Sequence, residues 1–418
     1  MTDVDVDMPD RAAGRGGRKF NARRDLIVGV ATAVLNERGV RGMTLAEVAA
    51  RAGMVTTGIA YYFGKKEALA AACFISGLER LQRLAESAQA GDTAAARVTL
   101  FVRGYFDLKA RIRSGEEPDI PIFSDIRTLS EPMQAEVLAR YYAFFGKVRD
   151  LLRTPELSWL RGSAAAARTN IILEQIYWLR AWIHRYDVED HPRLCERMLD
   201  VLLNGLAAPG MAWAPRPLDL EPAMAASEGD IPEALLTAAT RQINQHGYKG
   251  ASVERISAAL KRTKGAFYHH IEAKDDLVVA GFERTYDVLK AAQSAALDLD
   301  ADAWVRLHSA AAALAEFQLT PRGPLMRTSA LQSLPEPLRA SVIERSDRIA
   351  RRWSGMIADG VASGVLRAVD PAVAAQMLNA AINAVADLRL SDREREPRDA
   401  DRLYMAPMLM GLLNRITA

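Results

Sequence analysis

The chain has few cysteines and no long apolar run. Only Cys73 and Cys195 occur in 418 residues, and they lie far apart, so a disulfide framework is excluded as the main source of stability. No apolar stretch is long enough to cross a bilayer and none opens the chain, which predicts a cytoplasmic protein without membrane contact. The formal net charge is only +2, so the overall charge of the chain does not by itself point to a highly charged partner.

Signatures of enzymes and metal sites are also missing. The sequence contains no P-loop, no G-x-S-x-G nucleophile elbow and no dinucleotide fingerprint. His191 and Cys195 are four residues apart, but no companion pair completes the spacing of a structural zinc site, so we interpret His191 as the start of a solvated helix. We therefore expect a protein that is not an enzyme and that holds no cofactor and no metal.

Alanine and leucine are abundant, and the apolar residues recur with helical spacing. One such stripe consists of Ile349, Trp353, Met356 and Ile357. No segment alternates with the period of two that a half-buried strand requires. The sequence therefore predicts an all-α protein.

The chain repeats itself once. "RGVRGMTLAEVAARAG" returns without gaps as "HGYKGASVERISAALK", so that Gly39 matches Gly247 at an offset of 208 residues. Further along, Glu131–Pro132 matches Glu336–Pro337 at an offset of 205, and near the ends Gly205 and Gly411 have similar leucine-rich surroundings. The repeat therefore covers the whole chain.

A proline-rich stretch between the copies favours an extended connector. From these boundaries we predict a flexible basic arm at 1–22, a first helix-turn-helix domain at 23–70, a first helical regulatory domain at 71–207, a linker at 208–231, a second helix-turn-helix domain at 232–278 and a second helical regulatory domain at 279–418.

The opening motif of each copy predicts a helix-turn-helix. In the first copy, Thr44 and Glu47 form a capping box before a short helix, and Gly53 permits the sharp turn that follows. A further helix over 56–63 would bury Ile59 and Phe63. The second copy keeps the apolar pattern but lacks the turn glycine and the capping acid.

The outward face of the last helix in each motif carries small and hydrogen-bonding groups, which suit base edges in the major groove. The tyrosine and lysine at its end, and the N-terminus of the preceding helix, suit phosphates. The predicted DNA contacts are Arg18, Lys19, Thr44, Thr56, Thr57, Tyr61, Tyr62 and Lys66 in the first copy, and Ser252, Thr263, Lys264, Tyr268, His269, His270 and Lys274 in the second.

Charge is distributed unequally between the copies. Residues 11–70 hold eleven Arg or Lys against four Asp or Glu, whereas residues 232–278 hold seven against five. Six of the first eleven lie in "RAAGRGGRKFNARR", where glycines favour a flexible arm that neutralises phosphates or enters a minor groove. A solvated tail is the alternative. We expect the first copy to dominate the electrostatic affinity for DNA.

These residues resemble the tetracycline-repressor-type (TetR) family of bacterial transcription regulators. The resemblance rests on "GVRGMTLAEVAARAGMVTTGIAYYFGKKEAL" and "TKGAFYHHIEAKDDL", and the helical remainder extends it over the chain. It implies two TetR-like units packed as a covalent pseudo-dimer on double-stranded operator DNA, with a further homodimer left open. Because "TTGIAYY" and "KGAFYHH" differ, we expect one chain to read two unequal half-sites.

The resemblance also implies a repressor that a small molecule releases from its operator. The effector is unknown, and aromatic residues of the first half suit an apolar or aromatic one. The candidates for this pocket are Phe101, Tyr105, Phe123, Trp159 and Trp178, for which core or interface packing is the alternative interpretation. A second hypothesis for the whole chain is a binding scaffold in which only the first helix-turn-helix reads DNA.

Overall fold

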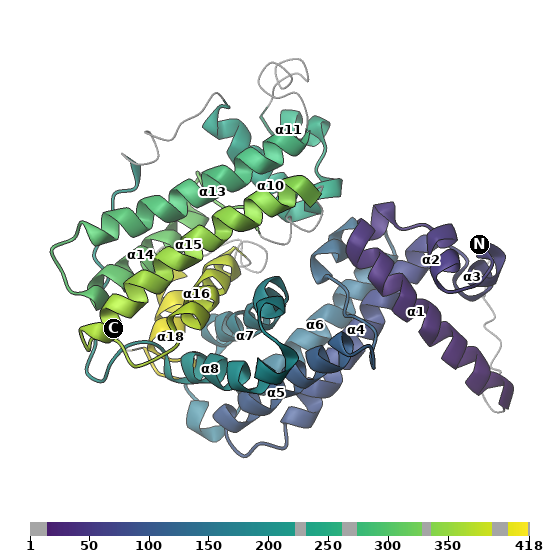
Figure 1. Cartoon of the computed structure of the whole chain (residues 1–418), viewed down its shortest axis with the longest axis horizontal. Helices are drawn as coiled ribbons and strands as arrows, with labels where there is room; N and C mark the ends of the chain where they lie inside the picture. Colours follow the sequence, from purple (N-terminus) through teal and green to yellow (C-terminus); the bar gives the residue numbers. More distant parts are fainter. Residues whose placement is uncertain (1–14, 222–230, 261–273, 328–335, 387–399, 417–418) are drawn as a thin grey trace. The chain divides into compact units, whose positions relative to one another are not determined.

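The computed structural model describes residues 15–221, 231–260, 274–327, 336–386 and 400–416 (Figure 1). Within these ranges every regular element is a helix, apart from an isolated antiparallel bridge between Ala207 and Leu366. The prediction of an all-α fold is therefore confirmed.

The first half runs through eight α-helices and four short 3₁₀ helices in the described part of the chain. In order they are α1 (Arg15–Gly42), α2 (Leu45–Arg51), α3 (Thr56–Phe63), α4 (Lys66–Ala88), α5 (Ala94–Arg113), η1 (Phe123–Thr128), α6 (Met133–Asp150), η2 (Pro155–Leu157), α7 (Gly162–Trp182), η3 (Ile183–Arg185), η4 (Val188–Asp190) and α8 (His191–Asn204).

The second half repeats this order as far as it is described. Its helices are α10 (Glu233–Gly250), α11 (Val253–Ala259), α13 (Lys274–Leu297), α14 (Ala303–Leu319), α15 (Glu336–Ala362), α16 (Pro371–Val385), the π-helix η7 (Asp401–Met405) and α18 (Ala406–Met410).

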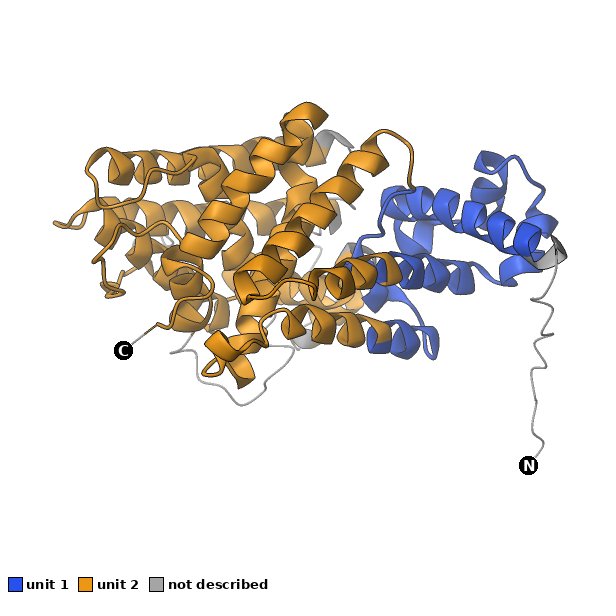
Figure 2. Ribbon diagram, turned by 90° about the horizontal axis from the view of Figure 1, so that it is seen from below, with its two compact units in different colours: residues 1–78, 118–139 blue, residues 79–117, 140–418 orange. Residues whose placement is uncertain are grey.

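The chain divides into two compact units (Figure 2). Unit 1 comprises residues 1–78 and 118–139, and therefore contains the first helix-turn-helix. Unit 2 comprises residues 79–117 and 140–418, and contains the larger part of the first half's regulatory helices together with the whole second half.

In unit 1, α1 begins earlier than the sequence indicates. It starts at Arg15, so the segment predicted as a flexible arm over 1–22 is helical from that residue on. Extending a helix that is already nucleated adds a hydrogen bond for each residue, which outweighs the cost of the two glycines at its start. The expectation for 1–14 lies outside the described residues.

Two equivalent glycines interrupt the first helix of each copy three residues before its last residue. Gly39 has φ 65° and Gly247 has φ 70°, which are left-handed conformations that a residue with a Cβ adopts only at a cost. The apolar face before Gly39 is buried as its spacing predicts: Ile27, Ala31 and Val34 are fully buried. The repeat therefore preserves this interruption near the end of the helix, although α1 has 28 residues and α10 has 18.

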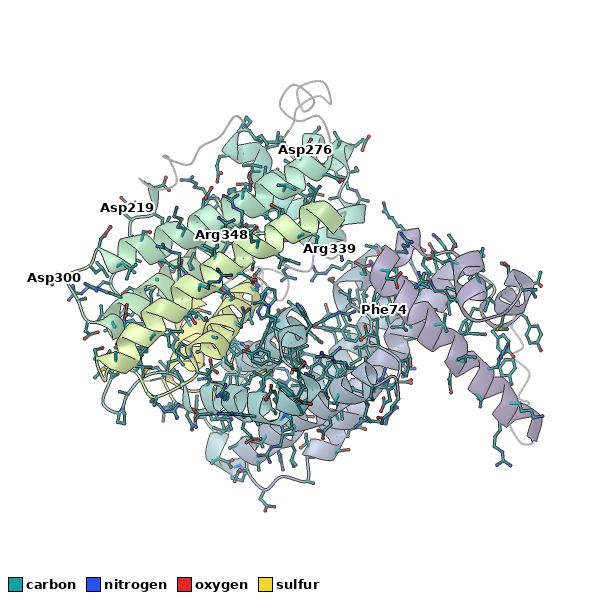
Figure 3. All side chains as sticks on the ribbon, viewed as in Figure 1. Phe74, Asp219, Asp276, Asp300, Arg339 and Arg348 are labelled. Atoms are coloured by element: carbon teal, nitrogen blue, oxygen red, sulfur yellow. The ribbon has the colours of Figure 1, made fainter. Side chains whose placement is uncertain are left out.

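In unit 2, α13 and α15 pack side by side (Figure 1). Ile349, Trp353 and Ile357 of the predicted stripe on α15 are buried. The other side of α15 faces solvent: Arg348, labelled in Figure 3, is exposed and pairs with Glu344 at 3.1 Å. The amphipathic sequence of α15 thus places one face in the core and the other in water.

The two copies meet inside unit 2. Helix α7 of the first half packs on α16 and η7 of the second, and α8 contacts α16 and α18. The Gln175 side-chain amide donates to the Met377 carbonyl at 3.0 Å, and the Trp178 indole donates to Gln376 Oε1 at 3.1 Å. We call this contact the joint between the copies.

The buried guanidinium of Arg168 also crosses the joint. Its Nε donates to the Leu412 carbonyl at 2.7 Å and its Nη2 to the Asn414 carbonyl at 3.1 Å. Burial lowers its pKa to about 10, so the group remains charged at neutral pH. Hydrogen bonds from a charged donor are the stronger kind, which makes Arg168 a fixed point between the copies.

The described part of the linker is extended, but it is attached to the second regulatory domain. The Trp213 ring lies 5.2 Å from the His308 ring, and its indole donates to Asp401 Oδ2 at 3.0 Å. The backbone N–H of Arg216 donates to Ser309 Oγ at 2.9 Å. The connector therefore contributes contacts of its own to unit 2.

Candidate DNA interface and ligand cavity

The first helix-turn-helix has the local geometry that its sequence predicts. The Glu47 backbone N–H donates to Thr44 Oγ1 at 3.2 Å, which caps α2. Gly53 in the turn has φ +63°. In α3, Ile59 is fully buried and holds the helix against the domain core. The face of α3 opposite Ile59 is therefore available to a partner.

The residues predicted to contact bases lie on that available face. Thr56, Thr57 and Tyr61 are all exposed, and Tyr61 has 77% of its surface accessible. Val55, just before α3, was not among the predicted contacts, yet it is 72% exposed. An apolar side chain at this place suits the methyl group of thymine. In the sequence, this contact is indicated by an apolar residue, Val55, that lies between the turn at Gly53 and the two threonines of α3.

An aromatic cluster joins α1 to α3. The Phe20 ring lies 4.7 Å from the Tyr62 ring and 6.2 Å from the Tyr61 ring. The Arg24 guanidinium lies 5.4 Å from the centre of the Phe63 ring. The start of α1 is therefore packed against α3, and it carries the exposed cations Arg18 and Lys19. Phe20 was not among the predicted contacts, because its ring partners Tyr61 and Tyr62 lie 41 and 42 residues further along the chain.

Lys66 has a structural contact in addition to its predicted role. Its ammonium donates to the Arg41 carbonyl at 2.9 Å and so joins the start of α4 to the end of α1. An ammonium has three donors, so this bond leaves capacity for a phosphate. Further from α3, Arg51 pairs with Glu37 at 2.7 Å and with Glu47 at 2.9 Å. These pairs neutralise acids of the domain.

The second helix-turn-helix is described only in part. The Ser252 hydroxyl accepts from the Arg255 backbone N–H at 3.3 Å, so α11 is capped even without the acid of a capping box. Ile256 and Leu277 belong to its buried core. Lys274 begins α13. The predicted contacts Thr263, Lys264, Tyr268, His269 and His270 lie outside the described residues.

The five predicted effector-pocket residues have different surroundings. Phe101 and Tyr105 are buried on α5, and Phe123 is half-buried in η1. The half-buried Trp159 lies under the Arg168 guanidinium, 5.2 Å from it. Trp178 lines a cavity, and the other residues lining that cavity belong to the second half. An effector pocket in the first half stays a prediction.

His191 begins α8 as predicted, but it is buried and not solvated. It has 3% of its surface exposed and packs edge-on against the Phe106 ring, with neither ring nitrogen bonded to a described residue. Among the residues that the structure describes, no group of three or more His, Cys, Asp or Glu is arranged to hold a metal. Cys195, like Cys73, is a buried free thiol.

The buried imidazole predicts a pH dependence of stability. Burial lowers the pKa of His191 in the folded chain, whereas the unfolded value is about 6.5. As pH falls below 6.5 the unfolded chain gains a proton that folded His191 does not, so stability decreases. We expect His191→Phe to lose less stability than the wild type between pH 7.5 and 5.5 in urea unfolding. Equal losses would contradict this.

The repeated motif matches a known family twice. "Bacterial regulatory proteins, tetR family" matches residues 27–73 and again 235–280, and "Tetracyclin repressor-like, C-terminal domain" matches residues 300–387. The chain belongs to the TetR family. Both matches to the N-terminal domain begin on the first helix of a copy and end in the helix after its helix-turn-helix, so this TetR chain is a tandem duplication.

Two curated relatives resemble a short part of this TetR chain. They are the HTH-type transcriptional repressors AcnR of Corynebacterium glutamicum and Corynebacterium efficiens, each 36% identical over 61 residues, which is 14% of this chain and 32% of AcnR. The chain thus spans about a third of the length of the relatives it matches. PfmR, a TetR family transcriptional regulator from Thermus thermophilus, is 26% identical, with 43% of this chain and 98% of PfmR covered and a TM-score of 0.36.

No described helix is long and apolar enough to cross a membrane.

Proposed function

We propose that this TetR chain is a sequence-specific DNA-binding transcriptional regulator, a repressor that leaves its operator when a small molecule binds. The observation that carries the proposal is the exposed face of α3, with Thr57 and Tyr61 directed away from the buried Ile59. A helix with this composition fits the major groove and meets base edges there.

Charge supports the same function. Residues 11–70 have an excess of seven positive charges, and the exposed Arg18 and Lys19 lie on the part of α1 that packs on α3 through Phe20. Cations beside a recognition helix release counterions from DNA on binding, so affinity falls steeply with salt. Similarity to the AcnR repressors over 61 residues favours repression over activation.

The joint between the copies supports reading by one chain. TetR regulators read two half-sites as a dimer, and here α7 and α8 of one copy meet α16, η7 and α18 of the other within a single polypeptide. The two recognition segments differ in sequence, so the operator need not be a palindrome. We infer two half-sites of unequal sequence.

The test is a mobility shift with DNA from upstream of the chain's own gene, across a salt series, followed by selection of binding sites from random DNA. We expect a specific complex that weakens steeply with salt and a selected site with two different halves. Binding that is indifferent to sequence would contradict the proposal. Selection of a perfect palindrome would contradict the unequal half-sites alone.

A second candidate function is a scaffold in which only the first helix-turn-helix reads DNA. It is favoured by the small charge excess of residues 232–278, which hold seven cations against five acids. Under this alternative, selection would return a single half-site.

A further inference from the structure

The first turns of α8 carry a histidine and a cysteine that are both buried and both without a hydrogen-bond partner. Neither ring nitrogen of His191 has a partner in the described part of the chain, although only 3% of its surface is exposed. Cys195 has 2% of its surface exposed and makes no hydrogen bond to a described residue either. A buried polar group without a partner requires an explanation, and a bound ion is one.

The other buried histidine and the other cysteine of the described chain do have partners. His308 Nδ1 lies 2.7 Å from the Trp304 carbonyl oxygen. The Cys73 thiol donates to the Val28 carbonyl at 3.6 Å. The missing partners are therefore particular to α8 and are not a general feature of buried histidine and cysteine in this chain.

His191 and Cys195 are directed into the same contact, the one between α8 and α5 (Figure 1). Their spacing of four residues places them on one face of the helix. The His191 ring packs edge-on against the Phe106 ring of α5, with the ring centroids 6.3 Å apart. Cys195 interacts electrostatically with Arg103 and Asp107 of the same helix. The two groups therefore lie on the face of α8 that α5 covers.

An imidazole and a thiolate four residues apart on a helix are a donor pair for a metal ion. Two histidines with this spacing hold zinc in the H-E-x-x-H motif. An ion about 2.0 Å from a nitrogen and about 2.3 Å from a sulfur joins donors about 4.3 Å apart when they lie on opposite sides of it. Side chains whose Cβ atoms are about 5–6 Å apart reach this separation without movement of the backbone.

Burial and charge select the kind of ion. Burial, together with Arg113 and Lys109, lowers the pKa of His191, so the ring is neutral at neutral pH, which is the form that binds a metal. One thiolate neutralises one positive charge, so a monovalent ion leaves the buried site uncharged, whereas a divalent ion leaves an unpaired charge. Among monovalent ions, thiolate ligands favour Cu(I).

We propose that His191 and Cys195 form a two-coordinate site for a soft monovalent cation of the Cu(I) class. On binding, the Cys195 thiol releases its proton to solvent and a sulfur–metal bond forms, while one ring nitrogen of His191 supplies the second bond. Nothing is oxidised or reduced. The zinc spacing that the sequence lacks concerns sites with four protein ligands, so it does not exclude this one. The site does not rest on the proposed function.

Binding is measured on the full chain, reduced and then freed of reductant without oxygen. The probes are Cu(I) buffered with bicinchoninate and Ag(I), which has the same charge and a similar preference for sulfur. We expect one ion per chain by native mass spectrometry, one proton released per ion, and a melting temperature raised by a few degrees. No bound ion at a one-to-one ratio would overturn the proposal. Tighter binding of Zn(II) than of Cu(I) would overturn the selection by charge.

Matched variants identify the two donors. Cys195→Ser should abolish stoichiometric binding and proton release, whereas Cys73→Ser should change neither, because the Cys73 thiol already has a partner. His191→Phe keeps a ring against Phe106 and should weaken Cu(I) binding at least tenfold. Undiminished binding in Cys195→Ser would place the ion elsewhere, and undiminished binding in His191→Phe would leave a lone thiol; either result overturns the site.

A measurement on the wild type keeps the test independent of folding of the variants. X-ray absorption at the copper edge of the loaded chain should show one nitrogen and one sulfur donor. Two sulfur donors would mean that a second cysteine supplies the other bond, which overturns the role of His191. Cys195→Ala is the second thiol-free variant should the serine variant fail to fold.

Discussion

Replacing Thr57 and Tyr61 together by alanine should weaken operator binding about 30-fold or more. Both side chains are exposed on α3, and contacts to base edges contribute about 1–3 kcal/mol each. The salt dependence should change little, because neither residue is a cation and the phosphate contacts remain. Affinity measured by fluorescence anisotropy over a salt series separates these two effects.

The control for this variant is Tyr142→Ala. Tyr142 is a tyrosine of α6 that is 65% exposed and is not among the predicted DNA contacts, so its removal should leave operator affinity unchanged. Tyr61 and Tyr142 each make a ring contact, Tyr61 with Phe20 and Tyr142 with Tyr141, so both proteins should lose a similar stability, about 0.5–1.5 kcal/mol per ring pair, and remain folded. A double variant that binds with wild-type affinity would remove α3 from the interface.

The same measurement on the second copy decides between the two candidate functions. Lys264→Ala with Tyr268→Ala should weaken binding to the other half-site if both helix-turn-helix motifs read DNA. No change in affinity, together with a loss in the α3 variant, would favour the scaffold in which the first motif acts alone.

Local features of this fold were predictable because short-range chemistry determines them. Gly53 has a positive φ where the sequence predicts a turn, the matching Gly39 and Gly247 both have a positive φ, and Thr44 caps α2 as predicted. The burial of Ile59 follows from helical spacing alone. The duplication made these predictions stronger, since the same residue types recur in register.

Contacts between distant segments were not predictable. His191 is buried because the Phe106 ring of α5 covers it, and nothing within α8 indicates that neighbour. The contact of Phe20 with Tyr62 depends on how far α1 extends, which the two glycines near its start obscured. Trp178 was expected at a pocket of the first half, yet the cavity that it lines belongs to the second. The first two outcomes depend on contacts between distant helices of the first copy, and the third depends on which faces of the two copies meet.

Gly205→Ala is expected to destabilise the chain by about 2–5 kcal/mol. Gly205 has φ +71°, and a Cβ there would lie 2.4 Å from the Gly411 nitrogen and 2.5 Å from the Leu409 carbonyl oxygen. The conformation costs roughly 1–2 kcal/mol for an L-residue and overpacking roughly 1–3 kcal/mol. The surrounding backbone cannot easily move, because the Leu206 N–H donates to the Leu409 carbonyl at 2.8 Å.

Gly210→Ala is the matched control, since Gly210 also has a positive φ, +87°, but no heavy atom within 4 Å of an added Cβ. It should carry the conformational cost without the clash, so urea unfolding of the two variants isolates the close approach of Gly205 to Gly411. Gly205 and Gly411 are counterparts in the two copies, and they meet where the copies join. Loosening that contact should also weaken operator binding, because the spacing of two half-sites is read only when the joint is rigid. Equal destabilisation by the two substitutions would show that the joint tolerates a methyl group at this place.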